Sequence, residues 1–296
     1  MPFLTRWFPA VVLCMACGCS TSTPVSENPA TKSAGDVPKA PALEDPIARL
    51  HAAMAELNPD YKQENAAFDP TDGAPLRAAE FNAAGVTDLT PLAKLKLVYL
   101  SLKDNPVSDL RPLAGMPIEE LYLEGTAVRD LRPVKSLPLR TLWLNKTPVV
   151  NLLPLDGLPL TQLNLLETKV TDLSPLAGMP LETLWLNKTQ VGDLTPLVNC
   201  PLVSLTLHGT PVNEISLARR WPTLQRLHIG ETEITDLRPL EGLRLTRLIV
   251  TPQKITQGWD VIRNMSTLQE LDIELREPQR WTPDEFWRRF DAGEFK

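Results

Sequence analysis

The sequence has few of the residues from which catalytic and metal sites are usually built. It contains three histidines and four cysteines in 296 residues. The histidines, His51, His208 and His228, do not share zinc-ligand spacing with any cysteine. Only Cys200 lies beyond the first 19 residues, which excludes an intrachain disulfide framework in the body of the chain. Nucleophile-elbow, zinc-protease, Walker A and kinase motifs are also missing. The sequence therefore predicts a protein that is not an enzyme and that holds no metal or cofactor.

An excess of positive charge is also missing. The chain has 36 acidic and 30 basic residues, for a formal net charge of −6. Binding to phosphate backbones needs a basic surface, so nucleic acid is excluded as a main partner. Proline, by contrast, is abundant at 29 residues. Most of these prolines recur at a fixed spacing, which indicates a repeat rather than low-complexity disorder.

The N-terminus is expected to be a targeting segment. One positive charge, Arg6, precedes an apolar run over residues 7–16 that is too short to span a bilayer and is typical of a signal peptide. The run leads into Gly18-Cys19-Ser20, which resembles the lipobox of bacterial lipoproteins. This resemblance implies a signal peptide over residues 1–18, a lipid on Cys19, and secretion to the periplasmic or surface side of a bacterial membrane. The alternative is a plain secretory signal with incidental cysteines. Membrane contact is expected only through the anchor.

Residues 19–42 are rich in Ser, Thr, Pro and Ala and contain two valines as their only aliphatic residues of any size. Such a composition cannot bury a core. We therefore expect a disordered tether between the lipid and the rest of the chain.

A repeat of 21 residues dominates the remainder. The segments 119–139, 140–160, 161–181 and 182–202 share the pattern x-x-L-x-L-x-x-T-x-V-x-D-L-x-P-L-x-x-L-P-L. In 161–181, Leu163 and Leu165 alternate with polar residues as one face of a strand requires, and Val170, Leu173 and Leu176 return the chain to the same interior. One coil cannot bury this set, but stacked coils form a continuous core. The array extends over residues 76–273.

This pattern resembles the leucine-rich repeat, specifically the short type of the bacterial internalins, whose consensus also carries D-[LI]-x-P-L. The resemblance implies an α/β solenoid with a parallel sheet on its concave face and short turns or 3-10 helices on its convex face. One departure concerns the asparagine expected after the strand, which is Asn105 in one repeat but threonine in the later ones. Threonine is expected to bond the backbone of the adjacent coil with fewer donors and acceptors than asparagine. Cys200 aligns with Met179 and Leu158 and is expected in the core.

Helical caps are expected at both ends of the array. Residues 43–75 are assigned to an N-terminal cap, with helical spacing of apolar residues over 43–58. Residues 274–296 are assigned to a C-terminal cap helix that begins at Thr282 and Pro283. Phe286, Trp287 and Phe290 are expected to seal the last coil. The C-terminal residues resemble the ends of leucine-rich-repeat proteins of planctomycete-type bacteria.

The outward-pointing strand residues form three predicted rows across the concave face. The second row brings together Tyr122, Trp143 and Trp185, with Asn145 and Asn187 beside them. Exposed aromatic residues are enriched at binding hot spots, but neighbouring rings can also cover one another and stabilise the sheet. His208 and His228 are expected to be solvated residues of this face rather than ligands. The predicted binding face comprises Tyr122, Trp143, Asn145, Asn164, Trp185, Asn187, His208 and His228.

The leading functional prediction is a non-enzymatic protein-binding scaffold of the cell envelope, with a protein as partner. A rigid concave surface limits the entropy lost on association. The alternative is a cell-wall or glycan-binding lipoprotein, in which Trp143 and Trp185 stack on sugar rings and Asn145 and Asn187 bond hydroxyl groups. Fold alone does not name the ligand.

Overall fold

The computed structural model describes residues 45–69, 75–275 and 280–295, which belong to one compact unit. The expected signal peptide, the lipidation site at Cys19 and the expected tether lie outside the described residues. Among the described residues, none of the helices combines the length and the apolar character that a membrane span requires.

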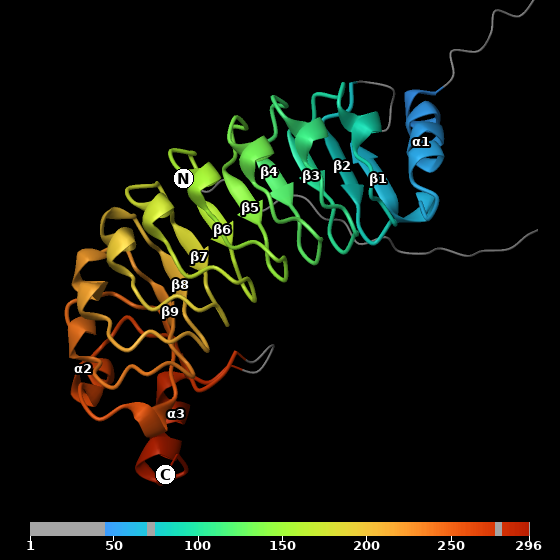
Figure 1. Ribbon diagram of the computed structural model, residues 1–296. Helices are drawn as coiled ribbons and strands as arrows, with labels where there is room; N and C mark the ends of the chain where they lie inside the picture. Colours follow the sequence, from blue (N-terminus) through green and yellow to red (C-terminus); the bar gives the residue numbers. More distant parts are fainter. Residues whose placement is uncertain (1–44, 70–74, 276–279, 296) are drawn as a thin grey trace, which may run out of the picture. The chain divides into compact units, whose positions relative to one another are not determined.

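One sheet runs through the described unit, and its strands follow one another in chain order (Figure 1). β1 and β2 are antiparallel, and every later pair is parallel and joins equivalent positions of successive repeats. A 21-residue period allows a strand of three residues in each coil. The strands are β1 (Ala66–Asp69), β2 (Ala78–Phe81), β3 (Tyr99–Ser101), β4 (Glu120–Tyr122), β5 (Thr141–Trp143), β6 (Gln162–Asn164), β7 (Thr183–Trp185), β8 (Ser204–Thr206), β9 (Arg226–His228), β10 (Arg247–Ile249) and β11 (Glu270–Asp272).

The 3-10 helices η2 to η9 lie on the other side of the array, which we call the turn side (Figure 1), whereas η1 directly precedes β1 and η10 closely follows β10. Most begin at the x-Pro-Leu of the repeat, because proline has the backbone angle of a first turn and its missing N–H is not needed there. The short convex-side turns predicted from the sequence are thus confirmed. The 3-10 helices are η1 (Gln63–Asn65), η2 (Thr90–Leu92), η3 (Arg111–Leu113), η4 (Arg132–Val134), η5 (Leu153–Leu155), η6 (Ser174–Leu176), η7 (Thr195–Asn199), η8 (Ser216–Arg220), η9 (Arg238–Leu240) and η10 (Pro252–Lys254).

The core is a continuous stack of the repeated apolar positions. Leu163, Leu165, Val170 and Leu176 are all fully buried, as are their equivalents in the neighbouring coils. Complete burial of one such side chain contributes about 1.5–3 kcal/mol. Cys200 is buried among them, as predicted, and burial raises the pKa of its thiol.

The threonine row differs from the prediction. Each threonine hydroxyl bonds a carbonyl of its own coil; Thr168 Oγ1, for example, donates to the Leu165 carbonyl at 2.7 Å. Asn105 does reach the preceding coil, where its amide donates to the Phe81 carbonyl and its Oδ1 accepts from the Val86 N–H at 2.9 Å. The expectation that threonine bonds the adjacent coil was therefore wrong. Its hydroxyl lies one carbon closer to the backbone than an amide and cannot span the gap.

The first coil is covered by α1 (Pro46–Leu57), whose Leu50 and Met54 are buried. Asn58 ends this helix and joins it to the array, because its Oδ1 accepts from the backbone N–H groups of Thr87 and Asp88, each at 2.7 Å. The antiparallel strand β1 that follows was not expected from the sequence.

The last coil is covered by α3 (Pro283–Asp291), which begins as predicted, with Thr282 Oγ1 accepting from the Glu285 N–H at 3.3 Å. Phe286 is fully buried, whereas Trp287 and Phe290 are partly buried against the core. A short helix, α2 (Trp259–Arg263), was not expected from the sequence. It places the centroid of the Trp259 ring 5.8 Å from that of the Phe286 ring.

Candidate functional site

The side chains that point away from the core form what we call the strand face. Strand register aligns them in three rows, as predicted. The first row is Tyr99, Glu120, Thr141, Gln162, Thr183, Ser204, Arg226 and Arg247. The second row is Ser101, Tyr122, Trp143, Asn164, Trp185, Thr206, His228 and Ile249. The third row, two residues further along each coil, is Lys103, Glu124, Asn145, Leu166, Asn187 and His208.

Four aromatic rings form a connected array on the strand face. The ring centroids are 5.2 Å apart between Tyr99 and Tyr122, 5.4 Å between Tyr122 and Trp143, and 5.7 Å between Trp143 and Trp185. The two tryptophans belong to β5 and β7, so their indoles meet over the intervening β6, where Asn164 is small and buried. All four rings are half-buried, which gives one aromatic surface rather than separate platforms.

The two tyrosine hydroxyl groups in this array are fixed by carboxylates. Tyr99 donates to Glu80 Oε1 at 3.1 Å and Tyr122 donates to Glu120 Oε2 at 3.0 Å. Burial, together with these carboxylates, raises the pKa of both phenols, so they stay neutral donors. The β2–β4 end of the strand face thus carries acidic groups that are hydrogen-bonded to the phenols.

His208 and His228 form a second ring pair, with centroids 5.0 Å apart. His228 is 8% exposed, so its predicted solvation was wrong: β8 and β10 enclose it on both sides. Burial and the neighbouring His208 lower the pKa of His228 to about 4, which keeps its ring neutral. Gly230 lies close to both rings. A Cβ at this residue would lie 3.0 Å from His228 Nε2 and 3.2 Å from His208 Nδ1, so the absence of a side chain gives the rings their room.

The buried polar atoms that lack a hydrogen-bond partner gather on the strand face. Among the described residues, all the side-chain atoms of this kind belong to the second and third rows between β4 and β9. A buried atom of this kind costs about 1–3 kcal/mol if it stays unpaired, so this part of the strand face has hydrogen-bonding capacity that the protein itself does not use. The atoms are Glu124 Oε2, Trp143 Nε1, Asn145 Oδ1, Asn187 Oδ1, Thr206 Oγ1, His208 Nδ1 and His228 Nε2.

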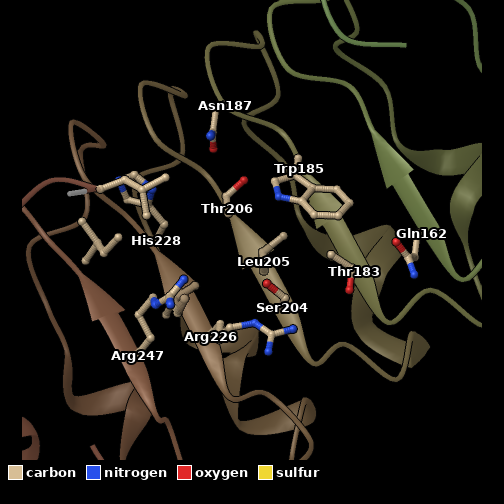
Figure 2. Close-up of a pocket in the computed structure, with 13 residues that line it drawn as sticks. Gln162, Thr183, Trp185, Asn187, Ser204, Leu205, Thr206, Arg226, His228 and Arg247 are labelled. Atoms are coloured by element: carbon tan, nitrogen blue, oxygen red, sulfur yellow. The ribbon is translucent and has the colours of Figure 1, made fainter. Parts of the chain in front are cut away.

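The same face is hollowed between β6 and β10, with a volume of about 410 Å³ (Figure 2). Figure 2 shows the Trp185 indole on one side and the Arg226 and Arg247 guanidinium groups on the other, with Ser204 and Thr206 of β8 between them. We call this the arginine hollow. Elsewhere, no cluster of three or more His, Cys, Asp or Glu side chains within the described part of the chain is arranged to hold a metal ion.

Comparisons with known proteins agree on the fold. No family model and no curated protein matches the sequence. Among solved structures, internalin C2 from Listeria monocytogenes is 32% identical, with a TM-score of 0.58 over 72% of this chain and 93% of that chain. The internalin inlF from the same organism is 22% identical, with a TM-score of 0.61 over 78% of this chain and 75% of that one.

The chain belongs to the leucine-rich-repeat proteins. Its repeats are similar to those of the internalins in both sequence pattern and the alternation of short strands with 3-10 turns.

On this leucine-rich-repeat protein, all eight predicted site residues lie on the strand face, in its second and third rows. Sequence interpretation did not single out Arg226, Thr206 or Glu124. A signal for Arg226 was present, since the first row changes from four uncharged residues to arginine at that position. For Glu124 and Thr206, burial without a partner is visible only once neighbouring side chains are placed.

Proposed function

We propose that this protein is a non-enzymatic scaffold that binds a protein partner through the strand face, centred on Trp143 and Trp185. The observation that carries the proposal is the set of buried, unpartnered polar atoms in the second and third rows. A bound chain with its own N–H and C=O groups can satisfy donors such as Trp143 Nε1 and acceptors such as Asn145 Oδ1. The connected aromatic rings beside these atoms supply the apolar contact that binding hot spots use.

A glycan of the cell wall is the second candidate. It is favoured by the pairing of Trp143 with Asn145 and of Trp185 with Asn187 in two identical TLWLNKT segments. The direct contact of the two indoles, at 5.7 Å between centroids, weighs against it, because each ring then has less free surface on which a sugar could stack.

Affinity capture separates the two candidates. Purified protein is incubated in parallel with solubilised envelope proteins and with isolated peptidoglycan, using wild type, the double variant Trp143→Ala/Trp185→Ala, and the turn-side control Leu153→Ala. We expect a defined set of proteins to be retained by wild type and by the control and lost by the double variant. Retention of peptidoglycan with the same dependence on the tryptophans would replace the protein partner with a glycan.

We further propose that the protein acts in the bacterial cell envelope, held by a lipid on Cys19. Support comes from the lipobox-like sequence Gly18-Cys19-Ser20. Labelling of producing cells with radioactive palmitate is expected to mark wild type and Cys17→Ala but not Cys19→Ala. Labelling that survives Cys19→Ala would refute the assignment.

A further inference from the structure

The arginine hollow has a charge opposite to that of the chain as a whole. Its lining includes Arg226 and Arg247 and no carboxylate, in a protein whose formal net charge is −6. The remaining polar groups that line it are neutral amides, hydroxyls and the neutral ring of His228. A positive hollow on an acidic protein attracts negative ligands to one place on the surface.

The two arginines differ in what they contact. Arg247 is paired through its Nε with Glu270, which also bonds Arg280 Nη1 at 2.8 Å. Arg226 is exposed and has no ion pair or side-chain hydrogen bond to any described residue. Its guanidinium therefore retains the full set of donors that match a carboxylate.

Unpartnered atoms continue from Arg226 into the hollow. Thr206 Oγ1 lies between Trp185 and Arg226 and has no partner, and Asn187 Oδ1 is also unsatisfied. His228, more than nine-tenths buried, lines the hollow, and its Nε2 is likewise unpaired. A ligand that reaches from Arg226 to Trp185 would thus meet a cation, hydroxyl and amide groups, and an aromatic ring in turn.

The opposite end of the strand face has the opposite charge. Glu80 and Glu120 hold the tyrosine hydroxyls there, and Glu124 is buried beside them with one unpaired oxygen. Like charges repel at close range, so these carboxylates disfavour an acidic segment over β2–β4. Of the two ends of the face, the one that holds the unpaired Arg226 is therefore the better match for an acidic ligand.

We propose that the arginine hollow binds an acidic side chain of a protein partner, with the carboxylate on the Arg226 guanidinium and the neighbouring residue of the partner against Trp185. The inference rests on the proposed protein-binding function and names the chemistry of its partner. A volume of about 410 Å³ with an aromatic wall accommodates a peptide segment rather than an isolated small anion. Thr206 donates its O–H to the same carboxylate or to the adjacent backbone carbonyl.

The test uses two fluorescein-labelled synthetic peptides of equal length, one of alternating Leu and Glu and one of alternating Leu and Lys. Binding to purified protein is measured by fluorescence anisotropy across a salt series. We expect the acidic peptide to bind, with affinity falling as salt rises, and Arg226→Glu to weaken it at least tenfold. Arg226→Lys retains the positive charge but not the planar guanidinium. Its affinity for the acidic peptide is expected to lie between those of wild type and Arg226→Glu.

The matched control is Arg220→Glu, which makes the same change of charge on the turn side in η8. It is expected to leave the affinity within twofold of wild type. Equal losses in the two variants, or no binding of the acidic peptide at millimolar concentration, would overturn the inference. Binding of the basic peptide alone, lost in Glu124→Gln, would also overturn it while leaving the strand face as a protein-binding surface. Failure of the proposed protein-binding function would be seen in a different experiment, the affinity capture, as envelope proteins that the Trp143→Ala/Trp185→Ala variant still retains.

Discussion

The turn side and the strand face of the array differ in how their polar groups are hydrogen-bonded. On the turn side the same device recurs: an aspartate accepts the backbone N–H two residues later, as Asp109 does from Arg111 at 2.9 Å and Asp172 does from Ser174 at 2.8 Å. On the strand face the residues change from coil to coil, and buried atoms are left without partners. The turn side therefore holds the coil together with one repeated local bond, while the strand face is free to vary and is where a ligand would be accommodated.

The largest expected effect is a loss of stability of the strand face in mild acid. Burial and His208 hold the pKa of His228 at about 4 in the folded chain, against an ordinary value of 6.5. Between these values the unfolded chain binds more protons than the folded one, so stability falls as the pH drops from about 6.5 to about 4. A shift of this size corresponds to on the order of 3 kcal/mol. Urea unfolding measured from pH 7 to pH 4 tests it.

Its control is His228→Gln, which cannot take up a proton and should flatten the stability curve over that interval. The turn side titrates in a different window: the Arg132 guanidinium and backbone N–H hold the pKa of Asp130 at about 2, so its contribution is lost only below about pH 4. If the stability of His228→Gln fell as steeply as that of wild type between pH 7 and pH 4, His228 would not be the group responsible.

A second prediction concerns the aromatic array. Trp143→Ala removes the ring contacts with Tyr122 and Trp185. Because each of the two aromatic pairs contributes about 0.5–1.5 kcal/mol beyond its buried area, we expect a loss of about 1–3 kcal/mol. The control is Leu153→Ala on the turn side, where a side chain that is 63% exposed should change stability by less than about 0.5 kcal/mol. Equal stability of the two variants by thermal unfolding would mean that the rings contribute nothing to the sheet.

The sequence predicted those parts of the molecule that the repeat imposes on every coil. Leu163 and Leu165 had to face inward because a strand alternates its side chains, and Pro283 after Thr282 marked the start of the last helix. The three rows followed from the period alone, since equivalent residues of successive coils pair in the sheet.

The remaining features depend on which neighbours a residue meets in space. Whether Trp143 reaches Trp185 depends on Asn164 being small, and whether His228 is solvated depends on β8 and β10 beside it. Arg226 has no carboxylate partner among the described residues, whereas Arg247 on the next strand is bonded to Glu270, which also bonds Arg280. None of these contacts recurs with the period, so the repeat pattern carries no information about them.

A third prediction is a gain of stability on the strand face. Glu124 is 6% exposed, one of its oxygens is unpaired, and burial raises the pKa of its carboxyl. In Glu124→Gln a neutral amide replaces the buried charge, and we expect about 1 kcal/mol of added stability at pH 7. Because the folded carboxyl has the raised pKa, wild type loses stability as the pH rises through that pKa, and the variant does not.

The matched control for this gain is Glu119→Gln, an exposed position before the same strand, where a change below about 0.5 kcal/mol is expected. Urea unfolding of both variants at pH 5 and pH 7 separates the effects. Destabilisation by Glu124→Gln would indicate that the ionised Glu124 carboxylate has a bonding partner in the folded chain. Its second oxygen would then cost less than an unpaired buried atom.

The smallest effect is expected on the turn side, where the chain already contains its own variant. Asn151 replaces the aspartate in one coil, yet its Oδ1 accepts from the Leu153 N–H at 2.9 Å, the same distance as that from Arg132 N–H to Asp130 Oδ1. The acceptor oxygen, not the charge, is therefore what the turn requires. Asp130→Asn should lower the Tm only slightly at pH 7, because exposed ion pairs such as Asp130–Arg132 add little.

Two further measurements separate the acceptor oxygen from the charge in this turn. Wild type gains its small advantage from the ionised carboxylate, so that advantage should vanish as the pH falls through about 2, the pKa of Asp130. Asp130→Ala removes the acceptor as well and should stay below both other proteins at every pH. If Asp130→Asn melted as low as Asp130→Ala at pH 7, charge rather than the acceptor would hold the turn. The turn side would then depend on side-chain identity coil by coil, as the strand face does.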